Sequence, residues 1–316
     1  MTPADFNVLF LGGAKRVSMA RLFKKAAADM GLKCNIFSYE MSTREAIACE
    51  ATVIEGLRWS DPAVDGHLRG IIQKNAIKAV VPFVDGAVAV AARLADVTFA
   101  PCCTPDKAEQ MFDKVVAATL FEKVSLPKPA TYVPGEPSLM LIAKPRHGSA
   151  SQGIVEIRSL EQLDTILGMG DKYLIQERID RREEYTVDCY ASVADGHVLV
   201  ASPRRRLQVA GGEVTKTVTV DMPELKALSA EAITRLDLRG AVTVQFMRDL
   251  DDNRLLLMEI NPRLGGGAVC SVLAGADIPS LIIHEALGMP LHSPEVQAGV
   301  EIARYPAETV FYPEKS

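Results

Sequence analysis

Short apolar runs alternate with amphipathic segments over the first third of the chain. Three runs have the length and composition of buried strands: 7–11, 33–39 and 79–82. Apolar residues at helical spacing follow each of them, in three segments: 18–30, 61–75 and 85–94. Strands that alternate with helices predict a parallel, doubly wound sheet, so we expect a small Rossmann-like domain that ends near Pro105. Asp85 stands where the N-cap of the third helix is expected.

The pattern changes around a proline-rich connector at 126–131, which cannot be helical. A helix at 106–123, with Asp106 as its expected N-cap, precedes the connector. Seven strands are expected beyond it: 139–144, 154–157, 173–177, 184–194, 197–203, 241–248 and 254–261. Helices are expected at two places among them: 160–167 and 223–236. Hairpin turns at Asp195-Gly196 and around Asp252 make this part α+β, with antiparallel strand pairs.

Composition limits the function classes that the chain can serve. Its 316 residues suggest two or three domains at roughly 100–200 residues each. A net charge of −5 and an aromatic content of 6% argue against a general nucleic-acid binder. No apolar run approaches the roughly 20 residues that span a bilayer, and no secretory leader is recognised at the first residues. The six cysteines show no C-x-x-C spacing, so a reduced, cytoplasmic protein is expected.

The last predicted hairpin gathers oxygen ligands on one face. If its turn is centred on Asp252, opposite residue numbers sum to about 504, which sets Gln245 against Glu259. Asn261 lies two residues beyond Glu259 and shares its face. One carboxylate with two amide oxygens suits Mg²⁺, which keeps waters and takes phosphate oxygens as further ligands. The alternative interpretation is an ordinary amphipathic hairpin with a polar face.

An arginine and a glycine-rich turn follow this hairpin. Arg263 comes directly after Pro262, which ends the strand, and Gly265, Gly266 and Gly267 follow. A glycine-rich turn beside an arginine is typical of an anion site, and Gly265 and Gly266 are candidate substrate contacts.

The string Met258-Glu-Ile-Asn-Pro-Arg263 resembles the E-x-N-P-R metal-binding signature of the ATP-grasp superfamily. With Gln245 fourteen residues before Glu259, the chain is most similar to one synthetase half of the carbamoyl-phosphate synthase large subunit. The resemblance implies a Rossmann-like pre-ATP-grasp domain (1–113), a small lid subdomain (114–188) and a metal-binding subdomain (189–316). It also implies ATP and Mg²⁺ as cofactors, for which Mn²⁺ can substitute.

Further motifs follow the family's order along the chain. Lys114 resembles the first ATP-binding basic residue, and Lys144, in Ile142-Ala-Lys-Pro145, resembles the second. The segment 146–153 resembles the phosphate-covering loop, from which four residues would contact ATP: His147, Gly148, Ser149 and Gly153. The segment 174–179 resembles the hinge that grips adenine through three residues: Glu177, Arg178 and Ile179. Glu184, seven residues after Glu177, resembles the ribose-binding acid.

The resemblance implies an ATP-dependent ligase that joins a carboxylate to an amine or similar nucleophile through an acylphosphate. Lys144 and Arg263 would be its catalytic residues, and its partners would be small molecules rather than nucleic acid or membrane. Two alternatives stay open. One is a non-catalytic ATP-binding or regulatory module, and the other is one unit of a split enzyme of the carbamoyl-phosphate synthase type. The chain has one synthetase unit and no glutaminase motif, and nothing in the sequence decides whether it forms a homodimer.

Several other residues have more than one reading. The basic run in Ser202-Pro-Arg-Arg-Arg-Leu207 is a solvated strand end, a contact for an acidic substrate or phosphate, with Arg206 as the candidate residue, or, least favoured, a contact for nucleic acid. Lys216 is a candidate phosphate contact. Asp85 is either a helix cap or a substrate contact. A dinucleotide site after the first strand is disfavoured, because a full G-x-G-x-x-G is missing and Glu40 lies too close to the glycines.

Overall fold

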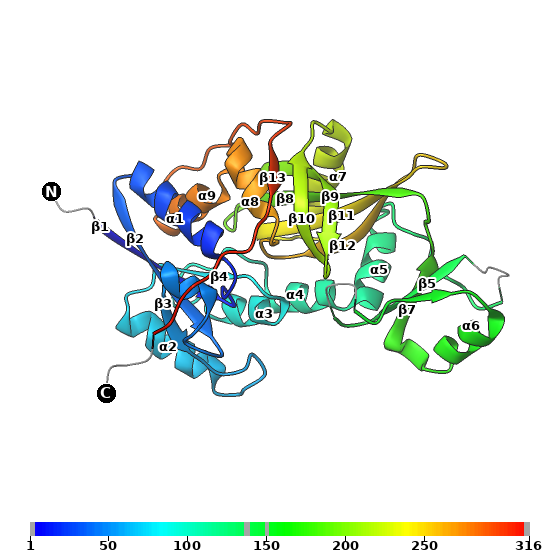
Figure 1. Ribbon diagram of the computed structural model, residues 1–316, viewed down its shortest axis with the longest axis horizontal. Helices are drawn as coiled ribbons and strands as arrows, with labels where there is room; N and C mark the ends of the chain where they lie inside the picture. The colour runs from blue at the N-terminus through cyan, green and yellow to red at the C-terminus, as the bar shows by residue number, and fades with distance from the viewer. Residues whose placement is uncertain (1–3, 136–139, 149–151, 313–316) are drawn as a thin grey trace.

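The computed structural model describes residues 4–135, 140–148 and 152–312, and these form three sheets with helices packed on them (Figure 1). The first sheet is entirely parallel, with strand order β3-β2-β1-β4. Its strands are β1 (Ala4–Leu11), β2 (Leu32–Glu40), β3 (Thr52–Glu55) and β4 (Ala79–Pro82). Its helices are α1 (Val17–Asp29), α2 (Val64–Lys74) and α3 (Asp85–Arg93), with a short 3-10 turn at Ala46–Cys49. The predicted Rossmann-like domain is confirmed, although β3 had not been predicted.

Two details of this domain differ from the sequence-based expectation. Val84, not Asp85, is the N-cap of α3, and Asp85 is the first helical residue. Its carboxylate forms an ion pair with Arg263 instead of capping the helix. A single helix at 106–123 is also wrong, because the chain forms α4 (Pro105–Phe112) and α5 (Lys114–Lys123).

The break between α4 and α5 falls at Asp113, whose backbone is extended (φ −89°, ψ 102°). Its carboxylate accepts hydrogen bonds from the N–H groups of Val115 and Val116, both at 3.1 Å, and so caps α5. The predicted cap Asp106 lies in the first turn of α4, where Thr104 is the N-cap. The cap at Asp113 starts α5 at Lys114, one of the residues singled out from the sequence.

A small antiparallel sheet, β6-β5-β7, lies at one end of the molecule (Figure 1). It consists of β5 (Leu141–Pro145), β6 (Val155–Ile157) and β7 (Tyr173–Glu177), with α6 (Leu160–Leu167) and a 3-10 turn at Gly170–Lys172. Its own small core contains Ile157, Leu163 and Ile166. We call this unit the lid.

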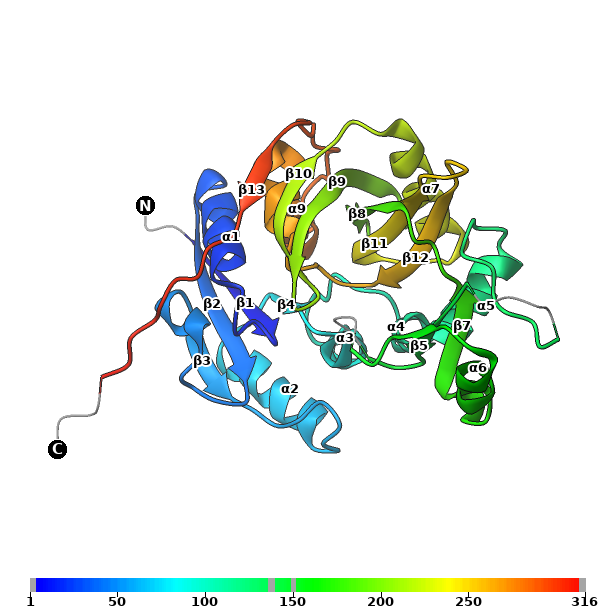
Figure 2. The ribbon, with the colours of Figure 1, turned by 45° about the vertical axis from the view of Figure 1, so that its right-hand side comes forward.

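The largest sheet is antiparallel and has the order β12-β11-β8-β9-β10-β13 (Figure 2). Its strands are β8 (Arg182–Ala191), β9 (Val198–Ala210), β10 (Glu213–Thr219), β11 (Gly240–Asp249), β12 (Leu255–Asn261) and β13 (Glu301–Ala303). The helical segments beside it are α7 (Pro223–Arg235), α8 (Ala268–Ser271), a π-turn (Val272–Ala276) and α9 (Ile278–Ala286). Strands β10 and β13 and the far half of β9 had not been predicted. The expected domain boundary at 188 falls inside β8.

After β13 the chain runs back along the first domain, where Thr309 donates a hydrogen bond to the carbonyl of Ala46 (Figure 2). Within the described residues, no single helix is long and apolar enough to cross a membrane. Two consecutive helical segments, Ala268–Ala276 and Ile278–Ala286, have the length and apolar composition of a membrane span only when they are taken together, and the chain bends by 79° between them.

Candidate active site

A cavity of about 720 Å³ lies between the lid and the six-stranded sheet. Helix α5 and strands β5 and β7 line it on the lid side, and strands β8, β9, β11 and β12 line it on the other. Eleven of the residues singled out from the sequence line it: Lys114, Lys144, His147, Gly148, Glu177, Arg178, Ile179, Glu184, Arg206, Gln245 and Glu259. The segments that carry them are far apart in the sequence, and the fold brings them to one place.

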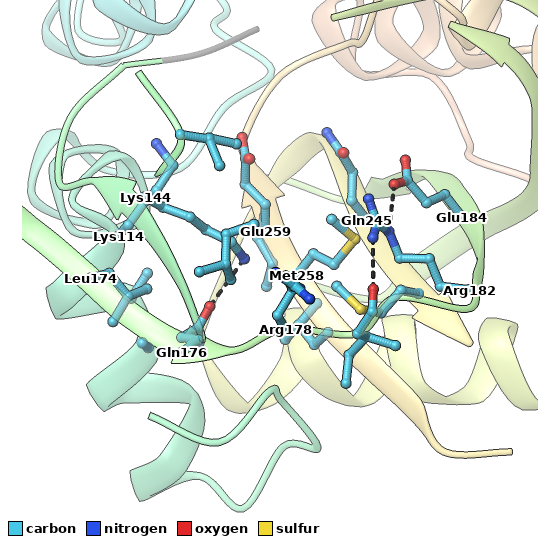
Figure 3. Close-up of a pocket in the computed structure, with 18 of the residues that line it drawn as sticks. Lys114, Lys144, Leu174, Gln176, Arg178, Arg182, Glu184, Gln245, Met258 and Glu259 are labelled. Carbon is cyan, nitrogen blue, oxygen red and sulfur yellow. Dashed lines mark hydrogen bonds and ion pairs between the residues drawn. The ribbon is translucent and has the colours of Figure 1, made fainter. Parts of the chain in front are cut away.

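Two lysines enter this cavity from the lid side (Figure 3). Lys144, on β5, donates a hydrogen bond to the side-chain oxygen of Gln176 on β7, at 3.0 Å. Burial lowers the pKa of the Lys144 ammonium to about 8, although the negative charge of Glu259 acts in the opposite direction. Lys114 donates to the carbonyl of Gly148 at 2.5 Å. Both ammonium groups are thus held in position by neutral oxygens.

The start of α5 is tied to the strand that carries Lys144. The backbone N–H of Lys114 donates to the carbonyl of Arg146, at 3.0 Å. The Arg146 guanidinium pairs with Asp113 at 2.7 Å, and Asp113 caps α5. The break in the predicted helix therefore fixes Lys114 beside the end of β5.

The opposite wall carries the predicted oxygen ligands. The register of β11 and β12 sets Gln245 opposite Glu259 and Thr243 opposite Asn261, as the turn-centred numbering predicted. Glu259 lines the cavity, and within the described part of the chain its carboxylate has no hydrogen bond or ion pair. Gln245 accepts a hydrogen bond from Arg206 at 3.2 Å. Asn261 is buried and lies beyond the cavity lining.

This donor set fits a divalent cation that also binds phosphate. The described residues hold no group of three or more His, Cys, Asp or Glu side chains that could hold a metal ion by themselves. A carboxylate that lacks a protein partner, with amide oxygens beside it, matches the few protein ligands that Mg²⁺ takes in nucleotide sites. Gln245 would have to share its oxygen with Arg206 or release it.

The hinge after β7 forms another wall. Glu177 accepts a hydrogen bond from the N–H of Ala130 at 2.8 Å and a double hydrogen bond from Arg254 at 2.9 and 3.0 Å. Burial favours a higher pKa for Glu177, but the hydrogen bonds from Arg254 and Ala130 outweigh it and lower that pKa. Arg178 pairs with Asp180 at 2.7 Å. The contact of Arg254 with this predicted site residue was missed from the sequence, because nothing near Arg254 in the chain points to Glu177.

Glu184 lies at the end of the cavity near the first residues of β8 (Figure 3). Its carboxylate pairs with Arg182 at 3.1 Å and with Arg206 at 3.3 Å. Burial lowers the pKa of Arg206, and the charge of Glu184 opposes that effect. Arg206 thus connects Glu184 with Gln245 across the cavity.

Other predicted site residues lie elsewhere. Lys216 and Gly153 do not line the cavity, and the Lys216 ammonium pairs with Glu301 at 2.8 Å. Ser149 lies outside the described residues. Three others gather at the first domain, namely Asp85, Arg263 and Gly266, whereas Gly265 lies against Thr243 and Arg204 of the large sheet. There Arg263 pairs with Asp85 and lies 3.5 Å from the side-chain oxygen of Asn261.

Residues 171–307 match the family described as ATP-grasp in the biosynthetic pathway with Ter operon. This match to an ATP-grasp family model covers less than half of the chain. Among solved structures, the chain is similar to the biotin carboxylase of Campylobacter jejuni in complex with β-γ-ATP, with a TM-score of 0.73 and 15% identity over 92% of this chain and 73% of that one. It is also similar to an L-amino acid ligase from Bacillus licheniformis, with a TM-score of 0.69 and 16% identity over 92% of this chain and 76% of that one.

Among curated proteins, the chain is 23% identical over 210 residues to acetyl-CoA carboxylase 2 of Oryza sativa subsp. japonica. The match covers 62% of this chain and 9% of that relative's length. The family match and the shared fold support an enzyme of the ATP-dependent ligase class. The two solved neighbours carry the names of different activities, so the fold leaves the acceptor open.

Proposed function

We propose that this chain is an ADP-forming ligase that activates a carboxylate with ATP and joins it to an amine or a similar nucleophile. One observation carries the proposal. Two lysines fixed by neutral oxygens and a carboxylate without a protein partner line the same cavity, between a lid and a sheet. Lysines neutralise phosphate oxygens, and a free carboxylate retains its capacity for a phosphate-bound cation.

The nucleotide would lie along the cavity from the hinge to the lysines. Its adenine would contact Glu177 and the backbone of Ile179, with Arg178 beside it. Apolar side chains at this end, including Leu174 and Met258, would pack on the base. Glu184 would bind the ribose, and the phosphates would reach Lys114, Lys144, His147 and Gly148.

The reaction would proceed in two steps. A carboxylate oxygen of the acceptor attacks the γ-phosphorus, the bond from that phosphorus to the β–γ bridging oxygen breaks, and ADP leaves. The amine then attacks the carbonyl carbon of the acylphosphate, loses a proton, and inorganic phosphate leaves. Lys144 would hold the γ-phosphate in line, and Arg263 would stabilise the charge on the acylphosphate.

A divalent cation, Mg²⁺ or Mn²⁺, would be held by Glu259 with Gln245 and Asn261, and would neutralise charge on the phosphate oxygens when bound. Glu259 has no other partner in the described structure, so we assign it the main part of this binding. Arg206 would move from Gln245 or share its oxygen, and Arg206 would then be free to contact substrate.

The test is ADP release from Mg-ATP in the presence of pooled amino acids, other small carboxylates and amines. We expect at least one pool to stimulate release, and Glu259→Gln to abolish the stimulated rate while leaving the melting temperature within a few degrees. Glu301→Gln is the matched control, because Glu301 pairs with Lys216 outside the cavity.

Two results would count against the proposal. Unchanged turnover in Glu259→Gln would remove the metal assignment. Tight ATP binding with no release in any pool would favour the non-catalytic module.

A further inference from the structure

The β11–β12 hairpin contacts both chain segments that connect the lid to the rest of the molecule. Leu250, in the turn of this hairpin, donates a backbone hydrogen bond to the carbonyl of Arg181 in the hinge after β7, at 2.8 Å. Leu257 of β12 donates another to the carbonyl of Pro127 in the proline-rich connector, at 2.7 Å. The connector leads into the lid and the hinge leads out of it, so this hairpin is placed to influence the cavity wall that the hinge forms.

Arg254 is the side chain through which the hairpin reaches that wall. Its Nη1 and Nη2 atoms donate to the two carboxylate oxygens of Glu177, at 2.9 and 3.0 Å. Glu177 lines the cavity, whereas Arg254 does not. An effect of Arg254 on a ligand in the cavity must therefore pass through Glu177.

Two acids of the same hairpin hold Arg254 in place. Its Nε donates to Asp252, which also accepts from the backbone N–H of Arg254 at 3.0 Å, and its Nη2 lies 3.2 Å from Asp249. The Arg254 side chain is 42% exposed, so a single ion pair there would contribute little to stability. The bidentate contact with Glu177 and the two further acids instead define an orientation.

The hydrogen bonds of Glu177 leave it one acceptor position for a ligand. Its Oε1 accepts from the backbone N–H of Ala130, at 2.8 Å, and from Arg254, and its Oε2 accepts from Arg254. A carboxylate has about four lone-pair positions, two on each oxygen. Within the described part of the chain, one position on Oε2 is left, and an ionised carboxylate accepts a hydrogen bond there but cannot donate one.

The same contacts favour the ionised form of Glu177. Burial raises its pKa, and the charge of Asp249 on β11 acts in the same direction. The hydrogen bonds from Arg254 and Ala130 outweigh both effects, so the pKa of Glu177 is lowered. Loss of Arg254 would therefore favour the protonated form and would also release the orientation of the carboxylate.

We propose that Arg254 is a positioning residue for nucleotide selection. It holds the Glu177 carboxylate so that the remaining position on Oε2 accepts from the 6-amino group of a purine and repels a 6-oxo group. ATP is therefore selected over ITP, which differs from it at that position. The inference rests on the proposed function for the place of the nucleotide in the cavity, but it does not require turnover.

Isothermal titration calorimetry of the full chain with Mg²⁺ and three nucleotides tests this selection. ATP, purine riboside triphosphate and ITP carry an amino group, a hydrogen and an oxygen at position 6. We expect ATP to bind about tenfold or more tightly than ITP, the usual size of a hydrogen bond to a charged group, and the purine nucleotide to lie between them. Arg254→Met should reduce the ratio of ATP to ITP affinity severalfold, mainly because ATP binds more weakly.

Three further variants separate positioning from a merely structural role. Arg181→Met is the matched control, because Arg181 pairs with Asp251 at 2.6 Å and joins the same hinge and hairpin without contacting Glu177; its ratio should equal that of the wild type. Glu177→Gln should lower the ratio, and addition of Arg254→Met to it should change the ratio no further. Arg254→Lys keeps the charge but not the fork, so its ratio should be intermediate, and it replaces Arg254→Met if that variant does not fold.

Several results would overturn the inference. An equal loss of affinity for ATP and ITP in Arg254→Met, an unchanged ratio, or additive effects in the double variant would make Arg254 structural. ADP release by a wild-type chain that binds ATP and ITP equally would refute the positioning role alone. Selection of ATP that depends on Arg254, without ADP release in any pool, would keep the positioning role and refute the ligase. A wild-type chain that binds neither nucleotide would refute both.

Discussion

Two cavities of the molecule differ in how their buried cations are compensated. In the larger one, Lys114, Lys144 and Arg206 each have an oxygen partner within hydrogen-bond distance. The smaller one, of about 360 Å³, lies at the carboxyl edge of the parallel sheet, and there two nitrogens of Arg16 have no hydrogen-bond partner in the described structure. The cations of the larger cavity are held in position by their oxygen partners, whereas the Arg16 guanidinium is desolvated without that support. Groups that are already held in position need little rearrangement to bind a ligand, and a buried charged group without hydrogen bonds costs free energy.

Arg204 can be compared with Arg16, because both lie against the glycine turn and both have a buried nitrogen without a partner in the described structure, but only Arg204 pairs with a buried acid. Its Nε donates to Asp188 at 2.8 Å, and Ser271 donates to the same carboxylate oxygen at 2.7 Å. Arg204→Met should lower the free energy of unfolding by about 3–5 kcal/mol, because it leaves the Asp188 charge buried and unpaired.

Urea denaturation measures this effect. Arg69→Met is the surface control, for which about 0–1 kcal/mol is expected, since Arg69 pairs with Asp96 on the surface of the first domain. If Arg204→Met lowers the free energy of unfolding no more than Arg69→Met does, then the ion pair of Arg204 with Asp188 contributes little to the stability of the folded chain.

A substitution of a lysine in the larger cavity should lower the rate of ADP release without lowering the stability of the fold. Lys144→Met removes a buried ammonium that would face the γ-phosphate, so the stimulated rate of ADP release should fall about 10²–10³-fold. The melting temperature should not decrease, since the ammonium is costly to bury. Steady-state kinetics and a thermal melt check both expectations. A variant that melts earlier but turns over normally would make Lys144 structural.

Local patterns predicted much of the larger cavity. The predicted pairing of Gln245 with Glu259 is confirmed, but not for the predicted reason. The register next to the turn sets Arg248 opposite Leu255, one residue away from the prediction, and an irregularity between Gln245 and Phe246 then brings Gln245 opposite Glu259. Strand β4, helix α6 and strand β7 begin and end where the apolar pattern indicated. These features depend on neighbours in the sequence, and the family resemblance supplied the roles that spacing could not.

The smaller cavity could not be predicted in this way. Arg16, Trp59, Glu213 and Arg263 come from four separate segments, and their meeting depends on how β10 and the glycine turn pack against the first domain. The break at Asp113 was missed for a related reason. The apolar pattern continues across it, and at the break Asp113 caps α5 and also pairs with Arg146 from a distant strand.

The pH dependence of ATP affinity should show whether Lys144 contributes to binding through its positive charge. With a pKa of about 8, the ammonium is protonated below pH 8 and neutral above it. Affinity for ATP should therefore fall as pH rises through 8, approaching about tenfold per pH unit. Lys144→Arg should flatten this profile, because a guanidinium stays charged.

The lowered pKa of Lys144 makes stability change with pH in the opposite direction to ATP affinity. The folded value lies below the ordinary 10.5, so protonation favours the unfolded chain. The contribution of Lys144 to stability should improve as pH rises from about 8 towards 10.5. A wild-type affinity profile that is flat up to pH 10 would show that Lys144 does not meet the phosphates as a cation.

The smallest expected effect is also the one with an unusual direction. Arg16→Met should raise the free energy of unfolding by about 0.5–1 kcal/mol, because it removes a desolvated charge whose Nε and Nη1 lack hydrogen bonds in the described structure, although the attraction of Glu213 offsets part of this gain. Urea denaturation measures the change, with Arg69→Met as the surface control. If Arg16→Met instead destabilises the free protein, Arg16 has a structural role that its missing partners do not indicate, and the two cavities do not differ in the way argued above.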